Sequence, residues 1–314
     1  MNKHPGFEIS DQWILVRRGE KNKVDPYKPY AYFVEKERTV SGKIEDIAVI
    51  FLTNNECPFR CLMCDLWKNT TDRPFPVGAI PEQIEWALNQ LPPVRHIKLY
   101  NSGSFLDVNA IPVKDYPAIA SLVNGFETVI IESHPKFINE KSLVFRDMLE
   151  PKLHIALGLE TVHPEILQRL NKRMDLKDFE FAVRFLNRNS ILSRAFILLR
   201  PPFLSESEGI HWAKKSIDFA FQSGVECCTV IPVRAGNGGM DYLFQHNLFS
   251  PPDIRSLENV IEYGIQLKAG RIFSDVWDIE KFSGCPKCVV QRKRRLVEMN
   301  LYQKVLASVT CNCH

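Results

Sequence analysis

The sequence predicts an α/β fold: a partial (β/α)6 barrel with a small cysteine-rich cap at the C-terminus. From residue 45 onward, short runs of β-branched residues alternate with stretches of helical pattern, which is typical of βαβ units and a parallel sheet. Right-handed crossovers curl about six such units into a full or partial barrel. The 314 residues suffice for one large domain with a small appendage, and four cysteines gather in residues 285–314.

Strands are expected where β-branched residues are concentrated. The expected strands are 47–53, 96–100, 128–132, 154–159, 195–199 and 228–233, with a weaker one at 271–276. Helices with apolar residues at helical spacing are expected between them. These are 81–91, 116–123, 140–149, 164–170, 176–187, 206–222 and 253–268. Pro81 is placed at the first helical position, where its missing N–H costs nothing.

The two ends of the chain differ from this alternating region. Residues 1–44 are polar, rich in lysine and proline and weakly patterned, so we expect an N-terminal extension that wraps over the main domain. The barrel is expected to span residues 45–277. Residues 278–314 carry two cysteine pairs around an expected helix at 289–307, and we interpret them as a metal-binding extension. Functional residues of such barrels gather at the carboxyl ends of the strands.

The charge balance narrows the classes of function. The 40 basic and 37 acidic residues give a net charge of +3, which neither argues for a nucleic-acid partner nor excludes one. The first ten residues lack the apolar core of a signal peptide, and no apolar run is long enough to cross a membrane. We therefore expect a cytoplasmic protein with no membrane partner. In that reducing compartment the nine cysteines are expected to be metal ligands or free thiols.

Three cysteines follow directly after the first expected strand. They lie in Asn55-Glu-Cys57-Pro-Phe-Arg-Cys61-Leu-Met-Cys64, with the spacing C-x3-C-x2-C. Three thiolates on one loop can each bind one iron of a [4Fe–4S] cubane and leave the fourth iron open to a small molecule. Zinc usually takes four ligands, or three and a water, commonly paired as C-x2-C. The spacing therefore favours a [4Fe–4S] cluster on Cys57, Cys61 and Cys64.

This motif, placed after the first strand of a βα series, resembles the radical S-adenosylmethionine (SAM) superfamily over about residues 45–275. The resemblance implies that SAM chelates the open iron through its amino and carboxylate groups, and that an electron from the cluster releases a 5′-deoxyadenosyl radical. It also implies an electron donor such as flavodoxin or ferredoxin. The residue before the third cysteine is often aromatic in the superfamily and contacts the adenine. Here it is Met63, which can still pack on a ring.

The superfamily also suggests which residues bind SAM. The candidate contacts are Met63, Ser102, Gly103, Ser104, Glu132, Glu160 and Arg194. The turn 102–104 follows the second strand, where glycine permits close backbone approach, although an ordinary strand-end turn has the same composition. Glu132 and Glu160 end the third and fourth strands and can bind ribose hydroxyls or substrate, or form salt bridges. Arg194 precedes the fifth strand and can clamp the SAM carboxylate.

Two segments narrow the resemblance. Residues 101–107 and 198–204 are similar to the branch that contains the Elongator catalytic subunit and the archaeosine-forming tRNA lyase. The compact cysteine spacing, followed by Asp65-Leu-Trp67, is closer to bacterial members linked to oligosaccharide antibiotic pathways, such as avilamycin-type sugar epimerases. Neither branch fixes the substrate.

The remaining cysteines are interpreted in two groups. The C-terminal group is Cys285, Cys288, Cys311 and Cys313. Four thiolates can close a zinc site or hold a second [4Fe–4S] cluster, and the choice stays open. Cys227 and Cys228 begin a strand, so one is expected to face the barrel interior and the other the helices. An interior thiol can donate a hydrogen atom to a substrate radical, whereas small buried cysteines are also common in cores.

Together these features predict a radical SAM enzyme that abstracts hydrogen from a small-molecule substrate. A carbohydrate and an epimerisation are our first expectation, because the net charge is near neutral and no RNA-binding domain is recognisable. A tRNA base-modifying enzyme is one alternative. A peptide-modifying enzyme is another, suggested by the cysteine-rich tail. A metal-binding module without catalytic activity is the rival from a different class.

Overall fold

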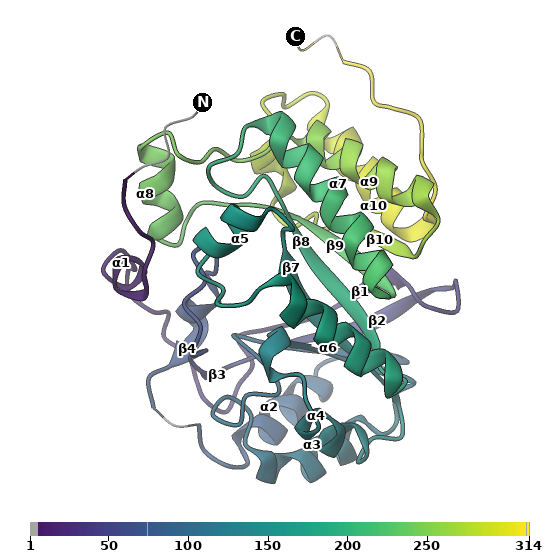
Figure 1. The fold of residues 1–314 in the computed structure, drawn as a ribbon. Coiled ribbons are helices and arrows are strands. Elements are labelled where there is room, and N and C mark those ends of the chain that lie inside the picture. The colour runs from purple at the N-terminus through teal and green to yellow at the C-terminus, as the bar shows by residue number, and fades with distance from the viewer. Residues whose placement is uncertain (1–5, 74, 312, 314) are drawn as a thin grey trace.

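The computed structural model describes residues 6–73, 75–311 and 313. The strands of the main sheet in these residues are β1 (Ala31–Arg38), β2 (Ile44–Leu52), β5 (His96–Asn101), β6 (Thr128–Ser133), β7 (Lys152–Glu160), β8 (Leu192–Leu199), β9 (Cys227–Pro232) and β10 (Arg271–Ser274). They lie side by side in that order. β1 is antiparallel to β2, and the other neighbours are parallel. The sheet curls into a half-barrel, which confirms the predicted fold (Figure 1).

Helices alternate with the strands and cover the convex face of the sheet (Figure 1). They are α2 (Ala79–Leu88), α3 (Tyr116–Val123), α4 (Lys141–Arg146), α5 (Pro164–Arg169), α6 (Leu176–Arg188), α7 (Glu206–Ser223), α9 (Ile254–Leu267) and α10 (Val289–Tyr302). Apolar side chains of both layers, such as Ile50 and Ile97 from the sheet and Ile84 and Ile217 from helices, share one core. No helix in the described part of the chain combines the length and apolar character needed to span a bilayer.

A second apolar cluster is separate from this core. It joins α1 (Asp11–Leu15) and α8 (Gly239–Gln245) through Ile14, Met240 and Leu243. The same cluster includes Leu62 of the cysteine loop and Leu198 of β8. The two short helices therefore pack beside the loop that carries the three-cysteine motif. A two-stranded ribbon of β3 (Asn54–Asn55) and β4 (Thr70–Thr71) closes the base of that loop.

Several helix boundaries follow from local chemistry. α6 and α7 begin with capping boxes, in which Asp175 pairs with Asp178 and Ser205 pairs with Glu208. Each box satisfies backbone N–H groups that the helix itself leaves free. α7 ends at Gly224, which adopts φ = 96°, a conformation that glycine reaches without strain.

All of the expected strands and helices are present, with shifted ends. α2 begins at Ala79, so Pro81 is its third residue and the predicted first position is wrong. α10 ends at Tyr302 rather than residue 307, because Gln303 turns to φ = 50° and bonds to the sheet. The sequence analysis missed β1, α1 and α8. β1 lies in residues 1–44 and pairs with β2 along its full length.

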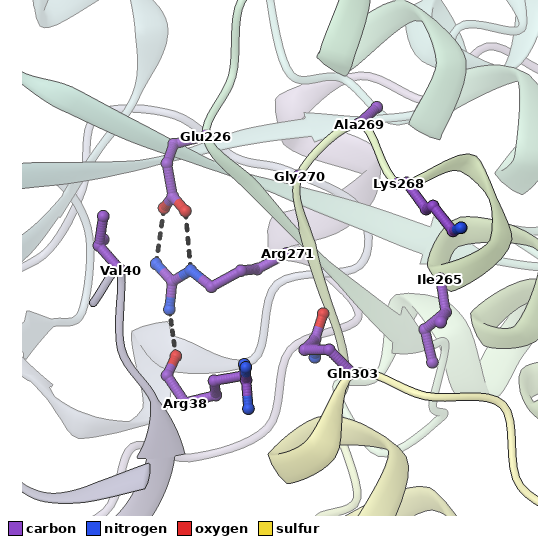
Figure 2. A pocket seen from close by; sticks show the side chains of 9 residues that line it. All are labelled: Arg38, Val40, Glu226, Ile265, Lys268, Ala269, Gly270, Arg271 and Gln303. Carbon is purple, nitrogen blue, oxygen red and sulfur yellow. Dashed lines mark hydrogen bonds and ion pairs between the residues drawn. The ribbon is translucent and has the colours of Figure 1, made fainter. Parts of the chain in front are cut away.

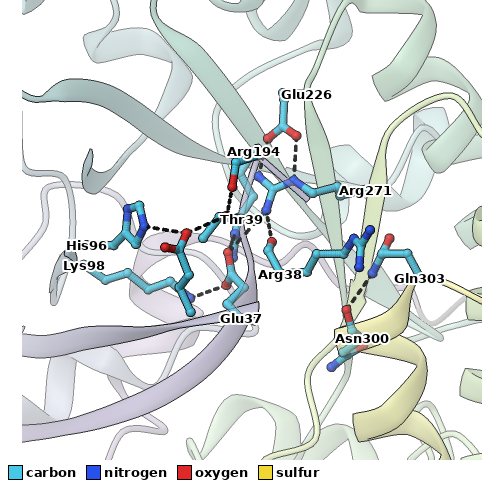
Figure 3. Close-up of polar contacts among 12 residues, drawn as sticks. Glu37, Arg38, Thr39, His96, Lys98, Arg194, Glu226, Arg271, Asn300 and Gln303 are labelled. Atoms are coloured by element: carbon cyan, nitrogen blue, oxygen red, sulfur yellow. Dashed lines mark hydrogen bonds and ion pairs between the residues drawn. The ribbon is translucent and has the colours of Figure 1, made fainter. Parts of the chain in front are cut away.

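β1 brings a carboxylate into the amino end of the half-barrel (Figure 3). Glu37 accepts hydrogen bonds from Lys98 at 2.5 Å and from Arg194 Nη1 at 3.2 Å. Arg271 Nη1 lies 3.7 Å from the same carboxylate. Burial alone would raise the pKa of Glu37, but Arg194 and Lys98 outweigh it and hold the pKa well below its usual value. This ion network ties β1, β5, β8 and β10 together.

The free edge of β10 is covered by amide side chains of α10 (Figure 3). Asn300 accepts from the Ser274 N–H at 2.8 Å and donates to its carbonyl at 2.9 Å. Gln303 does the same for Ile272, at 2.8 and 2.7 Å. The two amides replace the hydrogen bonds of a further strand, which protects an edge that would otherwise be open to pairing.

A shallow pocket lies at the amino end of β10 (Figure 2). The guanidinium of Arg271 lines it and donates to Glu226 at 2.7 and 2.6 Å and to the Arg38 carbonyl. The positive charge of Arg271 is therefore balanced by Glu226 within the protein. The sequence-predicted cysteine loop and glycine turn lie at the opposite, carboxyl end of the sheet.

Candidate functional site

The three cysteines of the motif lie on the loop between β2 and α2, at the carboxyl end of the sheet. They are Cys57, Cys61 and Cys64. Other segments hold the loop through its backbone. The Leu62 N–H donates to the Leu170 carbonyl at 2.9 Å, and Asn237 Nδ2 donates to the Leu62 carbonyl at 2.7 Å and the Cys64 carbonyl at 3.1 Å. The loop is thus fixed before any ligand binds.

These thiols are partly buried, and nearby cations such as Lys172 only partly offset the effect of burial on their pKa. Burial raises the pKa of each to about 12, so a metal must displace the protons when it binds. Within the described residues, the four C-terminal cysteines are close enough to share a single ion and the loop trio is not. A cubane does not require a shared ion, because it gives each thiolate its own iron.

The predicted glycine turn packs directly against this loop. Gly103 follows β5 with φ = 152°, and a Cβ added there would lie 3.0 Å from Cys57 Cβ. Any side chain would push the turn away from the cysteine. The turn is positioned by Asn54, whose Oδ1 accepts from the Ser102 N–H at 2.8 Å. Glycine is therefore required here for the close approach of the turn to Cys57; the predicted contact of the turn with SAM stays a prediction.

Several buried polar atoms beside the turn lack a hydrogen-bond partner among the described residues. They are both amide atoms of Asn101, Ser102 Oγ and Asp107 Oδ2. Buried polar groups without partners are costly and uncommon in folded proteins. A ligand with an amino group and hydroxyls would satisfy them. The turn and its surroundings therefore fit the SAM site that the resemblance implies.

A buried ion pair lies behind the loop. The sequence analysis left a salt bridge open for Glu160 but did not identify its partner, Lys172. Lys172 Nζ is 2.5 Å from Glu160 Oε1, and the two side chains are 8% and 7% exposed. A Cβ on Gly158 would lie 2.3 Å from Lys172 Nζ, so glycine makes room for the pair. Burial disfavours the Lys172 ammonium, but Glu160 and Cys61 outweigh it and raise its pKa. The structure thus holds a cation beside the thiols.

Glu132 lies near the carboxyl end of β6, and His134 follows that strand directly. Glu132 Oε1 accepts from the Asn101 N–H at 3.0 Å, and burial raises its pKa to about 8. The His134 N–H donates to Ser104 Oγ at 2.8 Å. The His134 ring stacks on Phe59 with centroids 3.8 Å apart, and burial lowers its pKa to about 3. The sequence analysis did not single out His134, whose neighbours come from distant segments.

Three candidate residues lie away from this site. Arg194 is bound to Glu37 at the amino end. Cys227 pairs in register with Arg194 and therefore faces the interior at that end. Cys228 packs in the core between the sheet and the helices, so the two cysteines face opposite sides, as expected. Neither is beside the cysteine loop. Met63, on the loop itself, packs against the second apolar cluster.

The concave face of the half-barrel is lined by aromatic rings. Consecutive ring centroids lie 5.6 to 6.3 Å apart. The rings are Trp277, Phe33, Phe51, Tyr30, Tyr100 and Phe196. Trp277 is 65% exposed. Such a surface offers flat faces on which a planar or apolar group can stack.

The four C-terminal cysteines come together at the start of α10. All of their sulfurs lie within 4.8 Å of one another, although two come from before the helix and two from the tail. The grouping confirms that the C-terminal extension can hold a metal.

Relatives of known sequence share much of this chain. No family model matches it. An uncharacterized protein of Methanocaldococcus jannaschii is 25% identical over 96% of this chain and 89% of its own length. The archaeosine synthase subunit beta of Thermococcus kodakarensis is 26% identical over 58% of this chain, and that of Methanosarcina acetivorans is 26% identical over 64%. Both matches span 60% of the archaeosine synthase subunit.

Solved structures share the fold. Methylornithine synthase covers 92% of this chain, and the match spans 93% of that protein, with a TM-score of 0.53 and 13% identity. Elp3 of Methanocaldococcus infernus covers 72% of this chain, with a match over 56% of its own length, a TM-score of 0.52 and 16% identity. The radical SAM methyltransferase TsrM of Kitasatospora setae covers 64%, with a match over 39% of its length, a TM-score of 0.50 and 15% identity. The chain therefore has the radical SAM fold.

Proposed function

We propose that this chain is a radical SAM enzyme in which Cys57, Cys61 and Cys64 hold a [4Fe–4S] cluster. The packing of the three-thiol loop against Gly103, beside buried polar atoms without partners, carries the proposal. When bound, the cluster and SAM supply a 5′-deoxyadenosyl radical that removes a hydrogen atom from the substrate. The radical SAM fold of the solved structures supports this chemistry.

The chain's own residues bind and orient the cofactors. Ser102 Oγ and the amide of Asn101 lie free to bind the amino group of SAM. Lys172 offsets negative charge on the thiolates, and Glu160 fixes its position. The raised pKa of Glu132 keeps its carboxyl group mostly protonated at neutral pH. The carboxyl group can therefore both donate a hydrogen bond to a ribose hydroxyl and accept one from it. Met63 is proposed beside the adenine. We leave Arg194 out of the SAM site because Glu37 binds its guanidinium.

The first candidate substrate is a small molecule, for example a carbohydrate that is epimerised. The near-neutral net charge supports it. An epimerase must return a hydrogen atom to the substrate radical, and neither Cys227 nor Cys228 lies beside the proposed cofactors. If this candidate is right, the hydrogen donor is another group of the concave face, such as Tyr30, whose buried hydroxyl lies beside Ser102 of the glycine turn.

The second candidate substrate is a base of tRNA. The archaeosine synthase relatives favour it, and exposed aromatic rings such as Trp277 suit a planar base. One assay distinguishes the two candidate substrates. Stimulation of 5′-deoxyadenosine formation by unmodified tRNA, weakened by salt, supports the second. Stimulation by nucleotide-sugars supports the first.

We further propose a reducing compartment, the cytoplasm, and an electron donor such as flavodoxin or ferredoxin. All nine cysteines are free of disulfides, which agrees with such a compartment.

The experiment that tests the proposal is anaerobic reconstitution with iron and sulfide, followed by reduction in the presence of SAM. We expect 5′-deoxyadenosine from the wild type and none from a variant with Cys57→Ala, Cys61→Ala and Cys64→Ala. Pro58→Ala is the matched control, because Pro58 is an exposed residue of the same loop. Circular dichroism would establish that the triple variant folds.

Two outcomes would overturn the proposal. One is equal 5′-deoxyadenosine formation by the folded triple variant. The other is a reconstituted wild type whose electron paramagnetic resonance (EPR) spectrum shows no cluster, or a cluster that SAM does not perturb. In that second case the protein would be a metal-binding module.

A further inference from the structure

The C-terminal tail returns to the start of α10 and completes a group of four thiols. Cys285 and Cys288 precede the helix, and Cys311 and Cys313 lie on the tail beyond it. Cys285 Sγ is 3.8 Å from Cys311 Sγ, and Cys288 Sγ is 3.9 Å from Cys313 Sγ. Each contact therefore joins one cysteine before the helix to one after it.

These distances distinguish between the possible occupants. A tetrahedral zinc site with Zn–S bonds of about 2.3 Å places its sulfurs about 3.8 Å apart. A disulfide would place them at about 2.05 Å. In a [4Fe–4S] cluster each thiolate binds a separate iron at a separate corner, so the sulfurs point apart. The observed spacing matches one ion shared by four thiolates.

We infer that Cys285, Cys288, Cys311 and Cys313 bind a single thiophilic divalent ion, Zn²⁺, and not a second iron–sulfur cluster. The site is complete within this chain and does not depend on SAM. The inference goes beyond the proposed function, because the same site would form in a protein that never cleaves SAM.

The surroundings supply positive charge to such a centre. Four thiolates and one Zn²⁺ carry a net charge of −2, which needs compensation when partly shielded from water. Arg292 Nε donates to Cys288 Sγ at 3.4 Å.

The ion would act as a clamp on the tail. Arg295 Nε donates to the Ala307 carbonyl at 2.8 Å, and Arg295 Nη1 lies 3.1 Å from Glu258 of α9. Arg292 Nη2 donates to the Val309 carbonyl at 3.1 Å. The tail therefore covers buried arginines of α10, the helix whose amides protect the edge of β10. Loss of the ion should loosen the tail first and the edge of the sheet next.

The experiment uses the full chain with Cys57→Ala, Cys61→Ala and Cys64→Ala, so that the loop cluster cannot contribute iron. We expect one zinc per chain by elemental analysis and no acid-labile sulfide. Replacement by Co²⁺ should give the visible spectrum of tetrahedral thiolate coordination. Adding Cys285→Ser or Cys313→Ser should abolish the bound ion, whereas Lys287→Ala, an exposed position in the same turn, should retain it.

A chelator titration keeps the test valid if a serine variant fails to fold. Release of one equivalent of zinc from the folded parent, with faster amide exchange in residues 303–311, supports the inference. About four irons and four sulfides per chain, lost in Cys285→Ser, would overturn it in favour of a cluster. A mass lower by 2 or 4 Da would show disulfides, and four thiols that react freely with no metal present would show that no site exists.

Discussion

The buried carboxylate of Glu37 makes the amino end of the half-barrel sensitive to one change in charge. The variant Glu37→Gln keeps the shape of the side chain and removes its charge. Glu37 is 7% exposed and lies within 2.5 Å of Lys98 Nζ, 3.2 Å of Arg194 Nη1 and 3.7 Å of Arg271 Nη1. The substitution leaves these cations around a neutral amide.

The expected loss follows from that burial. Removing one partner of a buried ion pair costs about 3–5 kcal/mol. In a chain of this size 1 kcal/mol corresponds to about 2 °C, so the melting temperature should fall by roughly 6–10 °C. The matched control is Asp46→Asn in the same hairpin. Asp46 pairs with Lys36 at 2.9 Å, and those side chains are 49% and 63% exposed. Such a surface pair contributes about 0–1 kcal/mol.

The pH dependence has a definite sign because Arg194 and Lys98 outweigh burial and depress the pKa of Glu37. Above its usual value of 4.5, the carboxylate is charged in the folded and unfolded chains, and the stabilisation is fully present. Below that value the unfolded chain takes up a proton and the folded chain does not, so the stability falls as the pH falls. The difference between wild type and Glu37→Gln should therefore shrink in acid.

Differential scanning calorimetry of the wild type and both variants, from about pH 3 to 8, measures these quantities. Equal melting temperatures for Glu37→Gln and Asp46→Asn would refute the stabilising role of the network. A difference between wild type and Glu37→Gln that stays constant below pH 4.5 would refute the depressed pKa.

Three further predictions concern the site and the sheet edge. In Gly103→Ala the added methyl group should push the turn away from Cys57. We expect this displacement to cost about 1–3 kcal/mol of SAM binding free energy, which is a roughly 5- to 150-fold loss of SAM affinity. EPR titration would measure it, and Gly125→Ala, with open space around it, should bind normally. Asn300→Leu should speed amide exchange in β10 about tenfold, since both side-chain hydrogen bonds to the Ser274 backbone are lost; unchanged exchange would contradict it. The His134 ring should show no NMR titration between about pH 5 and 8, because burial lowers its pKa to about 3.

Local patterns were enough to predict much of the fold. The strands from β2 onward bury an apolar face against the helices. This burial accounts for the runs of β-branched residues that alternate with helical stretches in the sequence. The spacing of Cys57, Cys61 and Cys64 and the turn at Gly103 are also local, so they could be identified without knowing what lies beside them. Their mutual contact follows from the parallel sheet, because neighbouring strands end at the same edge.

The features that were missed depend on partners far away in the sequence. β1 was not predicted because, in the sequence, Glu37 has the character of a polar surface residue. Its buried partners, Lys98 and Arg194, lie 61 and 157 residues away. Lys172 stands in an ordinary polar stretch, and its role depends on its approach to Glu160. Charged residues that are buried and paired cannot be told from exposed ones by composition alone.

β1 and β10 are the two outer strands of the curled sheet and share no ladder of backbone hydrogen bonds in the described residues; α10 contacts both of them. Side chains bridge them instead. Phe33 stacks on Trp277 with centroids 5.9 Å apart near the carboxyl end, where such a ring pair contributes about 1 kcal/mol. Parting these rings costs far less than unzipping two strands. Stacked rings therefore hold the carboxyl side of this junction, whereas buried ions hold its amino side, where Arg271 approaches Glu37 and the Arg38 carbonyl.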